Sequence, residues 1–163
     1  TSKCMATFTN ASWGVWDEDI DHTFKSTSGH VHFLFGTPIS WASTLQTGKP
    51  AQSSAEAEYV AAYSGATEGL SLNNLLIFLD IKDDEKAYKL FSDSTACIGM
   101  ARNPVNYKKN KQVQLKYHWV RHAVNSKELE ISYVPTNRQV ADIFTKTIKT
   151  IYQFEFLRSM LVH

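Results

Sequence analysis

The sequence predicts a mixed α/β fold in one domain. Strand-like segments come first, a long helical segment begins near residue 53, and strands then alternate with helices. The chain has 163 residues, the length of a single domain. A domain of this size buries roughly 70% of the surface that its unfolded chain exposes, so it needs no disulfide to fold. We expect residues 1–163 to form one domain with a helical tail at about 151–162.

Three strands are expected in the first 45 residues. Segment 4–9 (CMATFT) is the first, and Asn10 follows it directly. Segment 30–35 alternates in hydrophobicity as a half-buried strand does. A Gly-Thr-Pro turn then leads into a strand over 39–43. Short connections of this kind are typical of antiparallel pairing.

A long helix is expected next. Ser53 and Glu56 form a capping box, three residues apart, at the start of a helical pattern that extends to about Leu79. Gly65 and Gly69 lie in the middle of this pattern. Each glycine costs about 1 kcal/mol relative to alanine, so the helix could break there.

The next segment predicts a strand that ends at Asp93. Residues 87–91 have the pattern of a short buried strand, and 94–102 that of a helix whose first turn is capped by small hydroxyl side chains. Side chains at the carboxyl ends of strands in open α/β sheets converge on one crevice, where ligands bind. Asp93 is therefore a candidate ligand-binding residue, and its alternative role is that of a turn residue.

The last third of the chain predicts three more helices and a strand. The helices are expected over 113–124, 138–147 and 151–161, and the strand over 128–134. Asp142 lies in the second of these helices.

Basic residues are concentrated in one stretch, although the net charge is only +1. No acidic residue lies from Asn103 to Asn125. The basic side chains there are Lys108, Lys109, Lys111, Lys116 and Arg121. Such a patch on a near-neutral domain is typical of contact with phosphates, and a solvated helix face is the alternative. His118 lies in the same stretch and could add a sugar or stacking contact.

Cysteine usage and hydropathy indicate a soluble chain with reduced thiols. Cys4 and Cys97 both lie in apolar strand or helix patterns, which favours buried thiols over a disulfide framework. No apolar run approaches the ~18 residues needed to span a bilayer. We therefore expect no membrane partner.

Polar residues at strand ends and on facing helices suggest a cation site. The candidate residues are Asn10, Asp93 and Asp142, together with either Glu56 or Glu58. The two glutamates are about 200° apart around the helix, so only one can face a cleft. Three carboxylates with no cysteine or histidine ligand pattern favour a hard cation such as Mg²⁺.

Short segments along nearly the whole chain then point to a family. They are KSTSGHV (25–31), PISW (38–41), SSAEAEY (53–59), SDS (92–94), NP (103–104), KYHWVR (116–121), YVPT (133–136) and ADIFTK (141–146). In this order they resemble the ribonuclease H domain of copia-type LTR retrotransposon polyproteins. The resemblance implies a ribonuclease H-like fold: a mixed five-stranded sheet, three antiparallel strands and then two more, flanked by helices with an extra C-terminal helix.

The resemblance also implies a function. The family hydrolyses the RNA strand of RNA/DNA hybrids with two Mg²⁺ ions, or Mn²⁺, held by four acidic residues. The EYVAA pattern at 58–62 matches the family's helix motif, which assigns the helix carboxylate to Glu58 and leaves Glu56 as the capping residue. Asp93 and Asp142 match the third and fourth carboxylates. A reverse transcriptase domain in the same polyprotein, and a cytoplasmic virus-like particle or the nucleus as location, are implied as well.

The chain departs from the family at Asn10, where the family has an aspartate that bridges both metals. An amide carries no charge and cannot offset the repulsion between two cations. Hydrolysis is therefore expected to be lost or impaired. Gln112 and Gln114 also depart from the family's Lys-His-x-Asp segment. An engineered change explains Asn10 alone, whereas natural divergence explains all three residues.

Two functions remain open. One is a ribonuclease H that works beside a reverse transcriptase, with the basic stretch on the hybrid. The other is a domesticated or decayed module that binds nucleic acid or a protein partner without catalysis. Apolar side chains of the C-terminal helix could serve that protein partner: Phe154, Phe156, Leu157, Met160 and Leu161. Dependence on Mg²⁺ distinguishes the two functions.

Overall fold

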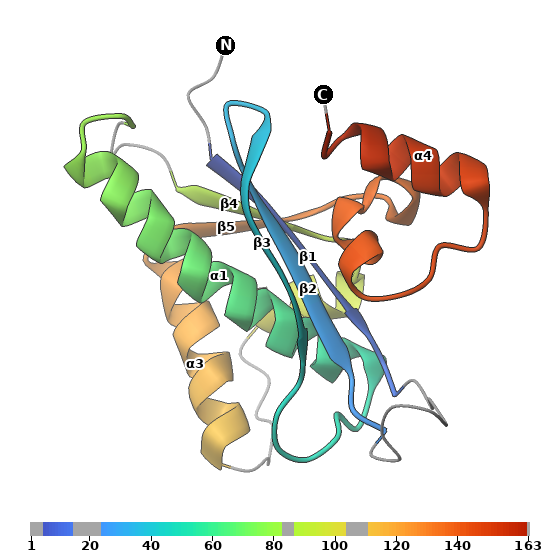
Figure 1. Cartoon of the computed structure of the whole chain (residues 1–163). Helices are drawn as coiled ribbons and strands as arrows, with labels where there is room; N and C mark the ends of the chain where they lie inside the picture. Colours follow the sequence, from blue (N-terminus) through green and yellow to red (C-terminus); the bar gives the residue numbers. More distant parts are fainter. Residues whose placement is uncertain (1–4, 15–23, 83–86, 104–110, 163) are drawn as a thin grey trace.

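The chain forms a five-stranded sheet covered on both faces by helical segments (Figure 1). The computed structural model describes residues 5–14, 24–82, 87–103 and 111–162, with the side chains of 111–114 outside this description. The strands are β1 (Met5–Ser12), β2 (Thr27–Leu34), β3 (Thr37–Leu45), β4 (Tyr88–Ser92) and β5 (Leu129–Tyr133). The helices are α1 (Ser54–Phe78), α2 (Thr95–Arg102), α3 (Lys111–Asn125) and α4 (Ile151–Ser159), with 3₁₀ turns η1 (Thr136–Arg138) and η2 (Val140–Phe144).

The sheet is mixed, with strand order β3-β2-β1-β4-β5. β1, β2 and β3 form an antiparallel meander, whereas β4 and β5 run parallel to β1. The fold expected from the sequence is thereby confirmed.

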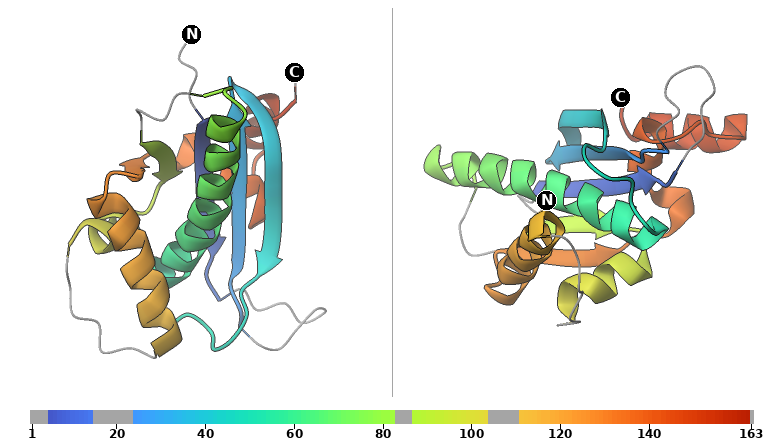
Figure 2. Two further views of the ribbon diagram at one scale, coloured as in Figure 1. Left: turned by 90° about the vertical axis from the view of Figure 1, so that its left-hand side faces the viewer. Right: turned by 90° about the horizontal axis from the view of Figure 1, so that it is seen from below.

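Each face of the sheet carries its own apolar core. α1, α2 and α3 pack on one face, and η2 with α4 lies on the other (Figures 1 and 2). β2 is covered from both sides: His30 and His32 are buried as fully as Val31. The expectation of a half-buried strand over 30–35 is wrong, because polar side chains on this strand face α1 rather than solvent.

α1 is one continuous helix. The hydroxyl of Ser53 accepts the backbone N–H of Glu56 at 3.2 Å, so the predicted cap is present. Gly65 and Gly69 do not break the helix; they let it approach the sheet. A Cβ on Gly65 would lie 2.4 Å from Thr9 Cγ2, closer than atoms can pack.

The helix expected over 138–147 is replaced by η1 and η2. Gln139 separates them with an extended backbone (φ −76°, ψ 90°). Its buried amide donates to the carbonyl of Thr9 at 3.0 Å, which ties the segment to β1. This contact with a strand 130 residues away in the sequence overrides the local helical pattern.

β1 is longer than expected. It extends to Ser12, which pairs with Thr27, so Asn10 lies within the strand rather than after it. Cys97 is a free, buried thiol, as expected, while Cys4 lies outside the described residues. Across the described ranges, no helix has both the length and the apolar character that crossing a membrane requires.

Candidate active site

The parallel pairing of β1 and β4 brings two of the expected site residues together. Phe8 of β1 pairs with Phe91 of β4, and the same register continued by two residues sets Asn10 level with Asp93. Asp93 lies between the end of β4 and the start of α2, where Ser94 caps the helix by accepting the N–H of Cys97. The strand-to-helix position predicted for Asp93 is therefore present.

Glu58 reaches this point from the second turn of α1. Its carboxylate accepts the backbone N–H of Ala11, and its Oε2 is buried without a hydrogen bond among the described residues. Burial, helped by the negative charges of Asp93 and Asp142, raises the pKa of Glu58 to about 8. The charges of Asp93 and Asp142 act on Glu58, and these three residues are hereafter called the carboxylate cluster.

Asp142 joins the carboxylate cluster from η2 on the other side of the sheet. Its side chain is buried, and Oδ2 pairs with Lys146 Nζ at 2.9 Å. Its other oxygen, Oδ1, is buried and makes no hydrogen bond within the described part of the chain. Burial raises the pKa of Asp142 and nearby Asp93 adds to this, although the Lys146 ion pair opposes it.

Asn10 is fully buried beside Asp142. Its Nδ2 donates to the hydroxyl of Thr145 at 2.7 Å, and its side chain also hydrogen-bonds Asp142. The amide thus acts as a hydrogen-bond donor toward η2. A carboxylate in its place would carry a charge and could not donate.

Glu56 points away from the carboxylate cluster, as expected for a capping residue. Its Oε2 accepts the backbone N–H of Gln52 at 3.0 Å at the start of α1. The helical spacing argument that only one of Glu56 and Glu58 can face the cleft therefore matches the geometry.

The oxygen chemistry of the carboxylate cluster suits a hard cation, although among the described residues only His30, His32 and Glu68 bring three ligand atoms within 4.8 Å of one another. Glu58 Oε2 and Asp142 Oδ1 are buried carboxylate oxygens that no described donor satisfies, which costs free energy unless a cation or water binds them. Oxygen ligands of this kind suit Mg²⁺ or Mn²⁺.

The basic stretch on α3 is only partly described. Lys108 and Lys109 lie outside the described residues, as does the side chain of Lys111. Lys116 Nζ lies 5.5 Å from the ring centroid of Tyr63 on α1. Arg121 Nε donates to the carbonyl of Met100 at 3.1 Å, so these two side chains contact α1 and α2.

Aromatic residues of α3 pack inward. Tyr117 is buried and stacks on Tyr59, with ring centroids 4.1 Å apart. Trp119 is half-buried and meets Tyr63 edge to face at 5.5 Å, packed against the core. His118, by contrast, is exposed on the helix surface.

Sequence reasoning missed two members of the site. Lys146 neutralises Asp142, and Thr145 holds Asn10. Both lie in the ADIFTK segment, and the four-residue spacing of Asp142 and Lys146 was the signal available for the ion pair.

Known proteins resemble the chain in sequence and in fold, although no family model matches it. It is 34% identical over 130 residues to a retrovirus-related Pol polyprotein from transposon TNT 1-94 of Nicotiana tabacum. It is 32% identical over 145 residues to that from transposon RE2 of Arabidopsis thaliana. The matches cover 80% and 89% of this chain but 10% of each relative, so the chain spans about a tenth of their length.

Solved structures share the fold at low sequence identity. RNase H1 from Halobacterium salinarum superposes with a TM-score of 0.59 at 12% identity, covering 86% of this chain and 93% of that one. LC11-RNase H1, solved in complex with an RNA/DNA hybrid, superposes with a TM-score of 0.55 at 15% identity, covering 86% of this chain and 93% of that one. The fold thus defines an RNase H-like domain. Sequence homology places the chain among the RNase H-like domains of copia-type retrotransposon Pol polyproteins.

Proposed function

We propose that this domain binds RNA/DNA hybrids at the carboxylate cluster, with a divalent cation, and that Asn10 impairs hydrolysis of the RNA strand. The observation that carries the proposal is the buried carboxylate of Asp142 near the half-buried Glu58 and Asp93, with one unpartnered oxygen each on Asp142 and Glu58, beside a neutral amide. The relation to Pol polyproteins and the hybrid bound by LC11-RNase H1 support the substrate class.

The charges in the cleft balance one divalent cation better than two. Glu58, Asp93 and Asp142 carry three negative charges when ionised, and the ammonium of Lys146 offsets one of them. Asn10 adds no charge. Two divalent cations would leave a net positive, partly buried site, which is costly in a medium of low dielectric. We therefore expect a single Mg²⁺ or Mn²⁺ here.

Each side chain has a distinct task in this proposal. Glu58, Asp93 and Asp142 hold the cation, and Lys146 keeps Asp142 ionised. A bound Mg²⁺ supplies Lewis acidity and lowers the pKa of its water. Asn10 fixes η2 through Thr145 but provides no fourth negative ligand, and loss of even a supporting group costs ~10–100-fold at metal sites.

The test is cleavage of a labelled RNA/DNA hybrid in Mg²⁺ and in Mn²⁺. Asn10→Asp is expected to raise the cleavage rate by about 100-fold or more over the chain as it stands. The double variant Asn10→Asp with Asp93→Asn serves as the control and is expected to be inactive. If Asn10→Asp is folded and still inert, one restored ligand does not suffice and the catalytic part of the proposal is wrong.

A second candidate function is a non-catalytic binding module. It is favoured by the Asn10 amide, whose hydrogen bonds to Thr145 and Asp142 give it a structural role. Such a module binds the hybrid equally well in Mg²⁺ and in a chelator, whereas the cation-dependent domain loses affinity in the chelator. Hybrid binding measured by fluorescence anisotropy in both buffers distinguishes the two.

The relatives also suggest a setting. Because the matched proteins are Pol polyproteins, we infer a reverse transcriptase domain in the same polyprotein and a cytoplasmic particle or the nucleus as location. Co-purification of the full polyprotein's reverse transcriptase activity with hybrid cleavage by the Asn10→Asp variant would test this setting.

A further inference from the structure

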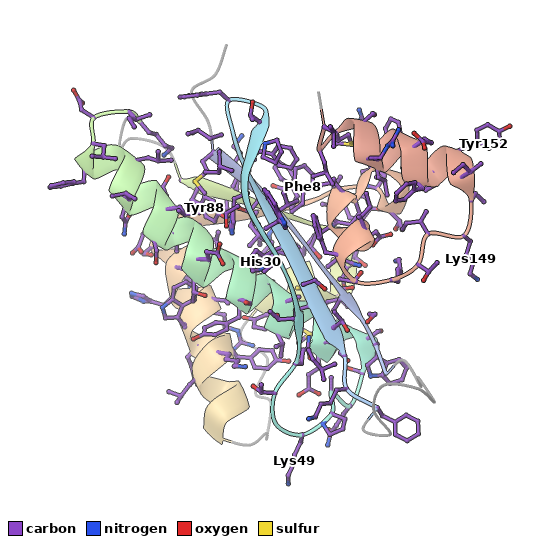
Figure 3. The ribbon with its side chains drawn as sticks, in the orientation of Figure 1. Phe8, His30, Lys49, Tyr88, Lys149 and Tyr152 are labelled. Carbon is purple, nitrogen blue, oxygen red and sulfur yellow. The ribbon has the colours of Figure 1, made fainter. Side chains whose placement is uncertain are left out.

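We infer that His30, His32 and Glu68 form a second metal site, which takes a transition-metal ion such as Zn²⁺. The three residues lie between β2 and α1, where the helix crosses the sheet; Figure 3 labels His30 at this crossing. One ligand atom of each residue lies within 4.8 Å of the others. This imidazole-rich set differs in chemistry from the carboxylate cluster, because nitrogen ligands suit Zn²⁺ rather than Mg²⁺.

Two distances between ligand atoms lie near those of a tetrahedral site. His30 Nε2 lies 2.9 Å from Glu68 Oε2, and His32 Nε2 lies 3.5 Å from Glu68 Oε1. Bonds of about 2.0–2.1 Å at tetrahedral angles put ligand atoms about 3.3 Å apart. The two distances fall on either side of this value and end on different oxygens of Glu68, so the side chains must shift to bring three ligand atoms around one ion.

The histidines are held as metal ligands are held. His32 is fully buried, and its Nδ1 hydrogen-bonds the hydroxyl of Thr7, which in turn accepts from Tyr88. This contact fixes the ring and aims Nε2 at Glu68, the supporting arrangement found behind metal-binding histidines. Nε2 itself is buried and has no hydrogen-bond partner among the described residues.

Glu68 is positioned and accessible. Its Oε1 accepts from the hydroxyl of Ser40 on β3 at 2.6 Å, which orients the carboxylate toward the histidines. Its side chain is 38% exposed, which gives an ion a path from solvent and leaves room for a water as fourth ligand.

The second site is independent of the carboxylate cluster. Glu68 lies ten residues beyond Glu58 on the continuous helix α1, about 15 Å along its axis. A bound ion would join β2 to α1 directly and stabilise the fold. It would take no part in hydrolysis.

The experiment is a Co²⁺ titration of the full chain in saturating Mg²⁺, followed by displacement with Zn²⁺. Co²⁺ in a tetrahedral site absorbs strongly in the visible range, so the spectrum reports the geometry. We expect one Co²⁺ per chain, displaced by one Zn²⁺, and a Zn²⁺-dependent rise in the melting temperature.

Three variants test the assignment. Glu68→Gln keeps the hydrogen bond from Ser40 but loses the carboxylate, and it should abolish the tetrahedral spectrum with the circular dichroism unchanged. Ser40→Ala, which removes the supporting hydroxyl, should weaken binding about 10–100-fold. The double variant His118→Gln and His122→Gln removes the other histidine pair, four residues apart on α3, and should leave the spectrum unchanged.

Two outcomes would overturn the inference. One is the absence of a tetrahedral Co²⁺ spectrum in the folded wild-type chain. The other is a spectrum that survives Glu68→Gln and disappears in the α3 double variant, which would move the site to His118 and His122.

Discussion

Asn10 acts on the site through its NH₂ group. The amide lies beside Asp142 and its Nδ2 donates a hydrogen bond to the Thr145 hydroxyl. A carboxylate at this position could not donate that hydrogen bond and would be repelled by Asp142. Replacing it by aspartate places a fourth negative charge in a largely buried cluster in which, among the described residues, Lys146 forms the ion pair with Asp142. The cost of this repulsion disappears when a cation binds.

We therefore predict that Asn10→Asp lowers the melting temperature in a chelator and enlarges the stabilisation by Mg²⁺. Burying one more unpaired carboxylate costs about 1–3 kcal/mol, an amount that is regained on cation binding. Thermal unfolding with and without Mg²⁺ measures both effects. Equal Mg²⁺ stabilisation of the two proteins would contradict the assignment of position 10 to the cation site.

Glu58 predicts a pH dependence of stability. Its pKa is about 8 in the folded chain and 4.5 in the unfolded chain, so its contribution is fully present below pH 4.5. Between pH 4.5 and 8 the unfolded chain releases the proton and the folded chain keeps it. Stability therefore falls as pH rises through this window.

In metal-free buffer, Glu58→Gln is expected to remove this slope and to stabilise the chain at pH 8 by on the order of 4 kcal/mol. Mg²⁺ should stabilise the native protein but not the variant. Urea unfolding at pH 5 and pH 8, in chelator and in Mg²⁺, measures both. Glu56→Gln is the matched control two positions away and should show no gain at pH 8.

Single residues of the site were predictable to different degrees. Helical geometry allows only one of Glu56 and Glu58 to face the cleft, and the resemblance to the family's helix motif selected Glu58. Asp93 was predictable because a strand and a helix meet there. The donor role of Asn10 and the pairing of His30 with Glu68 could not be predicted from the sequence, because both depend on contacts between distant segments.

At the scale of elements, α1 shows how a glycine can stabilise the packing of a helix on a sheet although it lowers the intrinsic stability of the helix. Gly69 faces Tyr88 so closely that an added Cβ would lie 1.8 Å from the phenol oxygen. Tyr88 is buried and bonded to Thr7, so it cannot move aside without breaking that contact. The lost helix propensity is thus exchanged for close packing of α1 on β1 and β4.

Gly69→Ala is accordingly expected to destabilise the fold by about 1–3 kcal/mol, despite the ~1 kcal/mol gain in helix propensity. Gly99→Ala in α2 is the matched control, because nothing lies within 4 Å of its added Cβ. It should leave stability unchanged or raise it by up to ~1 kcal/mol. Chemical denaturation of both variants measures the difference, and a stabilised Gly69→Ala would refute the close-packing argument.

Element types followed from local patterns wherever local interactions decide them. The Ser53 cap marked the start of α1, and the order of strands and helices agreed with the structure. The failure at 138–147 has a tertiary cause: the buried Gln139 amide bonds β1 and divides the segment into two short turns. Likewise, the burial of His30 and His32 arises from α1, which their own strand pattern does not reveal.

At the scale of the molecule, the C-terminal helix supports the segment that carries Asp142. Leu157 of α4 is fully buried, and Met160 and Leu161 pack on the core between η2 and β2. Tyr152, labelled in Figure 3, is 87% exposed at the outer side of α4. A protein partner on this outer side remains a prediction.

Leu157→Ala is predicted to destabilise the chain by about 2–5 kcal/mol and to weaken Mg²⁺ binding by loosening η2. Tyr152→Ala, on the same helix, should change stability by less than about 0.5 kcal/mol. Calorimetric Mg²⁺ titration and thermal unfolding of the two variants measure these effects. Unchanged Mg²⁺ affinity in a destabilised Leu157→Ala would show that α4 supports the core but not the site.

The hydrogen bond between Asn10 and Thr145 joins positions 135 residues apart in the sequence. During synthesis, the first strand leaves the ribosome long before η2 exists, so the carboxylate cluster cannot assemble until almost all of the described chain has emerged. Contacts of such long range also slow folding, because the chain must close a large loop first. The cation binding proposed for this cluster would therefore arise only in the finished domain, and a nascent chain could not acquire it early.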